Sequence, residues 1–369
     1  MTTTPDITII GGGVIGLLTA REFINAGATV TVVEKNLIGQ ESSWAGGGIL
    51  LPLYPWRQHE AISHLVIQSL KLYPALAQHL ADFTLINPEW RSCGLLITKN
   101  PDVHKATRWC AIHEIPVEVA TPTLYSRLNT LANNPLWLPT IGQIRNPRLL
   151  KSLKQDLLNK GVLLREHCHV AAATLKDNRI TELDTNLGKI SINHLVIAAG
   201  AWSQQVYGQL FPQFMDISPQ IAPIRGQMLL YQAEPDTLAH IILDGDRYLI
   251  PRRDGKIVVG STVENQGFDK STTSDAKSQL QHFAENLLPS LKKFPLIQHW
   301  AGLRPGTHNG VPYISKHPLI SNLSINAGHF RNGLVMAPAS AQLMADLILN
   351  RPPRIDPSPY TLNTLNVTA

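Results

Sequence analysis

Apolar runs separated by glycine turns organise the first part of the chain. Between residues 6 and 34 this pattern predicts a strand, a glycine turn, a helix over residues 14–26 and a second strand over residues 28–34. Apolar positions at helical spacing predict two further helices, over residues 61–81 and 148–160, and Gly161 follows the second where glycine often ends a helix. The chain therefore begins with one βαβ unit.

The remainder of the chain reads as short strands followed by one long helix. Strands are expected over residues 162–165, 179–183, 189–192 and 194–199, and Asp254-Gly255 predicts a hairpin between residues 247–252 and 256–262. The last helix is expected over residues 334–350. These elements indicate a mixed, partly antiparallel second region, and a length of 369 residues favours two domains.

Composition and charge narrow the classes of protein. With 44% hydrophobic and 16% charged residues the chain can form a large core, and its net charge of +5 is scattered, which argues against a nucleic-acid partner. The apolar run at residues 7–20 is too short to span a bilayer and lacks a basic leader. Three widely spaced cysteines disfavour a disulfide framework, so we expect a cytoplasmic protein.

The glycine turn carries a dinucleotide-binding fingerprint. Gly11, Gly13 and Gly16 form G-x-G-x-x-G between strand and helix, and Glu34 ends the next strand. These glycines permit a tight turn, close approach of the backbone to a pyrophosphate and close helix packing, while the helix N-terminus attracts negative charge. Glu34 would accept ribose hydroxyls and disfavours a 2′-phosphate. The fingerprint alone does not separate NAD from FAD.

Six separated segments resemble the glycine oxidase family of flavoproteins, within the D-amino-acid oxidase superfamily. The segments are Ile9–Gly16, residues 42–50 (SSWAGGGIL), Val196–Ser203 (VIAAGAWS), Tyr248–Arg252 (YLIPR), Trp300–Thr307 (WAGLRPGT) and Gly328–Gly333 (GHFRNG). The resemblance covers nearly the whole chain. It implies an α/β plus α+β fold, in which a discontinuous Rossmann-like domain binds FAD and a second domain with a mixed, largely antiparallel sheet binds substrate. It places residues 1–85, 146–220 and 300–369 in the first domain, and residues 86–145 and 221–299 in the second.

The resemblance also implies which residues contact FAD. Val170 would lie beside the adenine, Ser42 and Ser43 near the pyrophosphate and ribityl chain, and the segment from Gly46 to Ile49 along the flavin. The full implied set is Gly11, Gly13, Val14, Ile15, Gly16, Glu34, Lys35, Ser42, Ser43, Gly46, Gly47, Gly48, Ile49, Val170, Ala199, Gly200, Trp202, Arg304, His329, Arg331, Asn332, Gly333 and Leu334. Gly46 and Gly47 stand where relatives often have alanine, and Trp44 where a small residue is usual.

For the substrate, the resemblance implies that Arg304 clamps a carboxylate, that the Tyr248 hydroxyl reaches the same group and that Arg331 is a second arginine on the substrate side. The helix N-terminus near Gly333 would favour the anionic reduced flavin. No cysteine follows Cys168, whereas relatives with covalent flavin use a later cysteine, so we expect noncovalent FAD.

The chemistry implied is oxidation of glycine or another small amine, such as sarcosine or D-alanine, with oxygen as acceptor. The products are a 2-oxo acid, ammonia or amine, and hydrogen peroxide, and a role in thiamin thiazole synthesis is suggested. A D-amino-acid dehydrogenase with another acceptor, an NAD-dependent dehydrogenase and a noncatalytic flavin-binding module remain alternatives. A homo-oligomer is expected. We expect no metal site, because residues 167–169 (HCH) read as a strand with the two histidines on one face and Cys168 on the other.

Overall fold

The computed structural model describes residues 4–99, 101–130 and 134–362, and its first sheet contains the predicted βαβ unit. Strands β1 (Ile7–Ile10) and β2 (Val30–Val33) pair in parallel and are joined by helix α1 (Val14–Asn25). Both strands are buried along their whole length, as expected for a parallel sheet that is covered on both faces. The sheet order is β18-β19-β12-β1-β2-β8, and β18 is the only antiparallel edge among these six strands. The other bounds are β8 (Leu163–Arg165), β12 (His194–Ile197), β18 (Tyr313–Lys316) and β19 (Leu323–Ala327).

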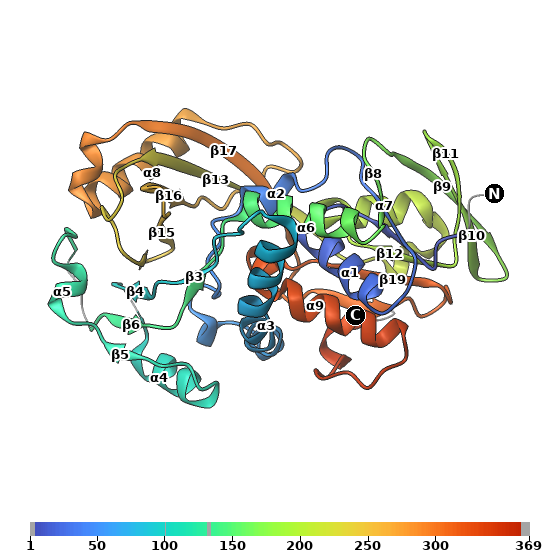
Figure 1. Cartoon of the computed structure of the whole chain (residues 1–369), viewed down its shortest axis with the longest axis horizontal. Helices are drawn as coiled ribbons and strands as arrows, with labels where there is room; N and C mark the ends of the chain where they lie inside the picture. The colour runs from blue at the N-terminus through green and yellow to red at the C-terminus, as the bar shows by residue number, and fades with distance from the viewer. Residues whose placement is uncertain (1–3, 100, 131–133, 363–369) are drawn as a thin grey trace.

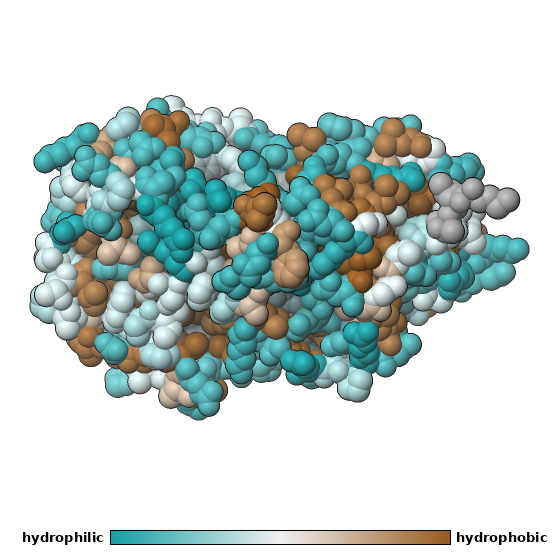
Figure 2. Space-filling view, viewed as in Figure 1, coloured by the Kyte–Doolittle hydropathy of each residue, from teal (hydrophilic) through white to brown (hydrophobic). Residues whose placement is uncertain are grey.

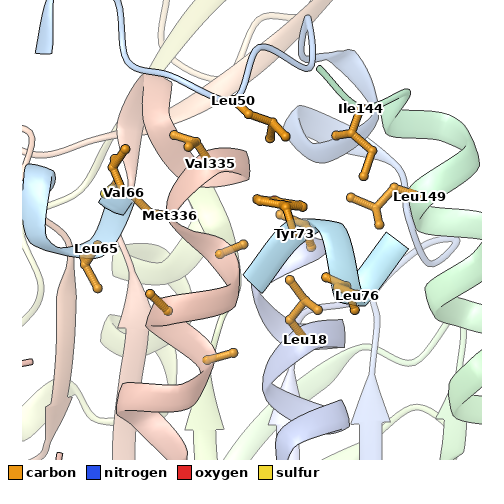
Figure 3. Close-up of a cluster of buried hydrophobic side chains, with 14 of the residues drawn as sticks. Leu18, Leu50, Leu65, Val66, Tyr73, Leu76, Ile144, Leu149, Val335 and Met336 are labelled. Carbon is orange, nitrogen blue, oxygen red and sulfur yellow. The ribbon is translucent and has the colours of Figure 1, made fainter. Parts of the chain in front are cut away.

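Four helices form the centre of the molecule in Figure 1. They are α1, α3 (Glu60–Thr84), α6 (Asn146–Asn159) and α9 (Gly333–Ile348), which pack on one another. Figure 3 shows their shared core, where Tyr73 lies among Leu18, Leu149 and Val335. The leucine stripe of α6 is buried here at Leu149, Leu150, Leu153 and Leu157, whereas Leu158, which was expected in the same stripe, is 46% exposed. Gly161 follows the helix with a φ of 81°.

An eight-stranded sheet forms the second region, in the order β17-β13-β16-β15-β14-β4-β6-β5. All its pairs are antiparallel except β14 with β4. The predicted hairpin is confirmed, because β15 and β16 pair across a turn in which Gly255 has a φ of 82°. The bounds are β4 (Leu95–Ile97), β5 (Glu118–Val119), β6 (Leu136–Leu138), β13 (Ala222–Gln232), β14 (Ile241–Asp244), β15 (Arg247–Pro251), β16 (Lys256–Gly260) and β17 (Leu296–Gly306).

A three-stranded antiparallel sheet is inserted in the sequence between β8 and β12, and its first strand corrects one prediction. Residues 167–169 are not a strand: they form the connection between β8 and β9, because His167 adopts a φ of 53° and the backbone turns. Cys168 is nevertheless buried and both histidines are exposed. The sheet consists of β9 (Val170–Lys176), which sequence analysis missed, with β10 (Arg179–Thr185) and β11 (Gly188–Ser191).

The predicted fold class is confirmed: one predominantly parallel α/β sheet lies beside a mixed, largely antiparallel one (Figure 1). The division into domain segments stays a prediction, and its boundary at residue 300 falls within β17. The remaining α-helices and strands of the described residues are α2 (Glu41–Ala45), α4 (Val103–Ile112), α5 (Pro122–Tyr125), α7 (Ser203–Leu210), α8 (Ser274–Leu287), β3 (Arg91–Ser92) and β7 (Gly142–Gln143).

Most of the surface seen in the view of Figure 2 is hydrophilic, and hydrophobic residues gather on it in separate patches. Within the described residues, no helix combines the length and hydropathy needed to cross a bilayer.

Candidate active site

One cavity, with a volume of about 520 Å³, brings together segments that are far apart in the sequence. Every predicted cofactor residue except Gly16 lines it, and so do Tyr248, Arg304 and Arg331. Gly16 instead packs α1 against the first turn, because a Cβ there would overlap the carbonyl oxygen of Gly11. All predicted site residues except Gly16 therefore line one cavity, and their individual contacts with a cofactor stay predictions.

The end of the cavity at the N-terminus of α1 is shaped for a pyrophosphate. Gly11 has a φ of 118°, and a Cβ there would overlap the backbone of Ala198 on β12. Gly13 leaves open space in which a Cβ would meet only Ser43 Oγ, at 3.0 Å. Ser43 Oγ accepts a hydrogen bond from the Val14 N–H at 2.9 Å. Backbone without side chains at a helix N-terminus is the arrangement that accepts a phosphate anion.

The carboxylate of Glu34 holds the glycine turn from the side of β2. Its Oε2 accepts the N–H of Gly12 at 2.8 Å, and its Oε1 accepts the N–H of Asn36 at 2.9 Å. Each carboxylate oxygen keeps a second lone pair, so the side chain can still accept the hydroxyls of a ribose. The glycine turn, the helix terminus and this carboxylate together fit an adenine dinucleotide.

The loop of residues 46–49 also lines the cavity. A Cβ on Gly47 would lie 2.7 Å from Ile250 Cδ1 and 3.1 Å from Tyr248 Cε2, so a glycine lets β15 approach the loop. A Cβ on Gly46 would lie 2.9 Å from Asn146 Nδ2. Both departures from the family pattern therefore accompany close packing around the loop.

Trp44, the third departure, packs outside the cavity. Its ring meets Trp300 of β17 edge to face, with 5.9 Å between the ring centroids. The Trp300 indole N–H donates to the carbonyl oxygen of Ala45 at 3.0 Å, so this pair fastens α2 to the second sheet.

Arg304 projects into the cavity from β17. Its Nη2 donates to Ser261 Oγ at 2.8 Å and its Nη1 to the Thr262 carbonyl oxygen at 3.1 Å. Burial lowers the pKa of Arg304 to about 10, an effect that Tyr248 opposes and Arg331 reinforces. The guanidinium stays charged at neutral pH. Within the described part of the chain, no carboxylate lies within ion-pairing distance of it.

Arg331 gives the cavity a second cation. It lies between β19 and α9, and it has no hydrogen-bond or ion-pair partner among the residues that the structure describes. Its neighbour His329 is fully buried, faces Ser340 Oγ at 3.0 Å, and has a pKa that burial lowers to about 3. Two arginines without carboxylate partners therefore line the cavity, and the nearby His329 is neutral. A cavity with this charge favours an anionic ligand.

Sequence analysis missed the glycines that make room for these side chains. A Cβ on Gly226 of β13 would overlap both terminal nitrogens of Arg304. A Cβ on Gly260 of β16 would lie 2.5 Å from the ring of Tyr248. The signal was present, because glycine inside a strand often marks a close approach. Asn146 was also missed: it is buried, lines the cavity, and its Oδ1 has no partner among the described residues.

The parallel sheet with its glycine turn and the cavity beside it define the class of protein as an enzyme that binds a dinucleotide cofactor. The sequence profile of the family described as FAD dependent oxidoreductase matches residues 6–347. The chain belongs to this family, and FAD is its cofactor.

Individual relatives match over nearly the full length. The chain is 42% identical to the glycine oxidase of Pseudomonas aeruginosa and 41% identical to that of Pseudomonas putida, over 96% of this chain and 97% of each relative. The crystal structure of glycine oxidase from Geobacillus kaustophilus superposes with a TM-score of 0.90 at 27% identity, covering 98% of this chain and 99% of that one.

Proposed function

We propose that this enzyme oxidatively deaminates glycine or another small amino acid or amine, such as sarcosine or D-alanine. The products are the 2-oxo acid, ammonia or amine, and hydrogen peroxide. The observation that carries this proposal is the pair of charged arginines, Arg304 and Arg331, which have no carboxylate partner in the described chain and line the same cavity as the cofactor residues. The similarity to two glycine oxidases at more than 40% identity supports it.

The residues around the cavity would orient the substrate rather than attack it. FAD, when bound, would supply the hydride acceptor, so the task of the protein's own residues would be to hold the Cα–H in position and to stabilise negative charge on the reduced cofactor. The planar fork of Arg304 suits both oxygens of a carboxylate, and the Tyr248 hydroxyl can donate to one of them. With its carboxylate so held, the substrate amine keeps the lone pair that assists hydride departure.

The N-terminus of helix α9 would stabilise negative charge on the reduced cofactor. Its first residues, Gly333 and Leu334, line the cavity, so the positive end of a 16-residue helix points toward the cofactor space. Preorganised dipoles of this kind favour the anionic form of a reduced cofactor.

A second cavity, of about 630 Å³, supports an access route for the substrate. It shares Leu53, Phe330, Arg331 and Asn332 with the first and also contains Arg57 and Asp246. Arg331 would therefore meet an incoming carboxylate before Arg304 does.

The expected cytoplasmic location, homo-oligomer and role in thiamin synthesis stay predictions. The role in thiamin synthesis is supported by a bifunctional ThiO/ThiG protein of Synechocystis, which is 28% identical over 95% of this chain and 52% of that protein.

Steady-state assays with glycine, sarcosine and D-alanine test the proposal. We expect one equivalent each of hydrogen peroxide and 2-oxo acid per equivalent of oxygen consumed, with glyoxylate as the product from glycine. Turnover only with an artificial electron acceptor, without peroxide, would instead identify a dehydrogenase. No turnover of any of the three with either acceptor would refute the proposal.

A further inference from the structure

The buried cation Arg252 contacts the loop of residues 46–49, which lines the cavity and which the resemblance places along the flavin. It directly follows β15, and it continues the alternation of Tyr248 and Ile250, which lie on one face of that strand. Tyr248 and Ile250 approach Gly47. The Nη2 of Arg252 donates to the Gly47 carbonyl oxygen at 2.7 Å. The face that carries Tyr248, the tyrosine expected to bind the substrate, therefore also contacts the loop of residues 46–49.

The environment of Arg252 is unusual for an arginine. Only 8% of its surface is exposed, and no carboxylate among the described residues lies within ion-pairing distance. Its Nη1 donates to Gln143 Oε1 at 2.6 Å and to the Ile144 carbonyl oxygen at 3.4 Å. Burial lowers its pKa to about 10, which still leaves the group protonated at neutral pH. A buried cation held only by neutral oxygens is costly, so its charge calls for a function.

The hydrogen bond from Arg252 sets the direction of one peptide group. In a trans peptide the C=O and the following N–H point in opposite directions. Because the Gly47 carbonyl points at Arg252, the N–H of Gly48 points away from Arg252. Gly47 and Gly48 line the cavity and Arg252 does not. The Gly48 N–H makes no hydrogen bond within the described residues.

The other groups of the loop are fixed from the opposite side. The Gly48 carbonyl accepts the Ile144 N–H at 2.9 Å, and the Leu50 N–H donates to the Gly142 carbonyl at 3.0 Å. The Gly47–Gly48 peptide is therefore the part of this loop whose orientation depends on Arg252.

We propose that Arg252 is a positioning residue for the flavin: by holding the Gly47 carbonyl it presents the Gly48 N–H to an acceptor on the isoalloxazine, and its charge polarises that donor. This inference rests on FAD binding in the proposed enzyme, not on the identity of the substrate. A polarised donor aimed at the ring favours electron-rich states of the flavin.

Sulfite titration of the holoenzyme tests this without any amino-acid substrate, because sulfite adds to the electron-poor flavin ring and bleaches it. In Arg252→Gln we expect sulfite Kd to rise at least tenfold. The flavin midpoint potential should fall, by about 30 mV for each tenfold change in a two-electron equilibrium. Arg252→Lys keeps the charge without the fork and should give a smaller change.

Arg91 supplies the matched control. Its Nη2 reaches the carbonyl oxygen of Pro251, beside Arg252 in the chain, at 3.4 Å, but it does not contact the loop of residues 46–49. Arg91→Gln and Arg91→Lys should leave sulfite Kd within twofold. If Arg252→Gln does not yield folded holoenzyme, Arg252→Lys decides: a rise of threefold or more supports the proposal and a change below twofold overturns it. Equal shifts in the Arg91 and Arg252 variants also overturn it, and failure of glycine oxidation would leave these readouts unaffected.

Discussion

Replacing Gly226 by alanine should damage the carboxylate site without removing any charged group. The new Cβ would overlap both terminal nitrogens of Arg304, which must then move by about 1 Å. That movement breaks the hydrogen bonds to Ser261 and Thr262, each of which involves a charged donor worth about 1.5–3 kcal/mol. A misplacement of this size costs up to about 100-fold, so kcat/KM for glycine should fall by about 10–100-fold, mainly through KM.

The assay is steady-state oxygen consumption, with flavin content measured on the same samples. Gly208→Ala on α7 is a control, because its Cβ would meet only the side chain of Met215, at 3.1 Å. If Gly226 acts through the guanidinium alone, the Gly226→Ala/Arg304→Ala double variant should be no worse than Arg304→Ala. Wild-type kcat/KM in Gly226→Ala, or losses that add in the double variant, would show that the close approach of these residues is not functional.

Four further outcomes are expected. Gly13→Val should purify without flavin, because its side chain fills the pyrophosphate space; stoichiometric FAD by absorbance would contradict this. Acid precipitation should release all flavin to the supernatant, and a yellow pellet would show a covalent link. Arg304→Ala should lower kcat/KM for glycine by about 30-fold to several thousand-fold, as for the loss of a buried charge pair costing about 2–5 kcal/mol; a carboxylate-free amine should be little affected, and a larger loss in Arg331→Ala would exchange the two roles. Burial lowers the pKa of His317 to about 4 and that of His329 to about 3, so the unfolded chain binds more protons between about pH 4 and 6.5. The free energy of unfolding should therefore fall as the pH drops through this range, by up to about 1.4 kcal/mol per pH unit for each histidine, and a flat denaturant-unfolding profile would refute this.

The sequence predicted the elements whose signals are local. The βαβ unit, the leucine stripe of α6 and the hairpin around Gly255 each follow from spacing within a few residues, and all three are present. Strand β9 was missed, and residues 167–169 were taken as a strand in its place. In the turn that residues 167–169 form, Cys168 is buried and both histidines are exposed, which is also the pattern of a strand. The order of apolar and polar residues therefore could not distinguish a turn from a strand here.

The site was predictable where a motif carries it and not where distant strands create it. The resemblance predicts Arg304 and Tyr248 as site residues and both line the cavity, but the room for them comes from Gly226 and Gly260 on other strands. The contact of Arg252 with Gly47 joins residues 205 positions apart in the chain. Such contacts depend on sheet order and register, which local patterns do not encode.

The central claim, an FAD enzyme that orients a small amino acid through its carboxylate, is tested most directly by anaerobic reduction of the bound flavin. Glycine, sarcosine and D-alanine would each be added to the oxygen-free protein while the flavin absorbance is followed. We expect at least one of them to bleach the wild-type protein fully, and the same compound to reduce Arg304→Ala much more slowly. A flavin that stays oxidised with all three, while dithionite still reduces it, would contradict the account.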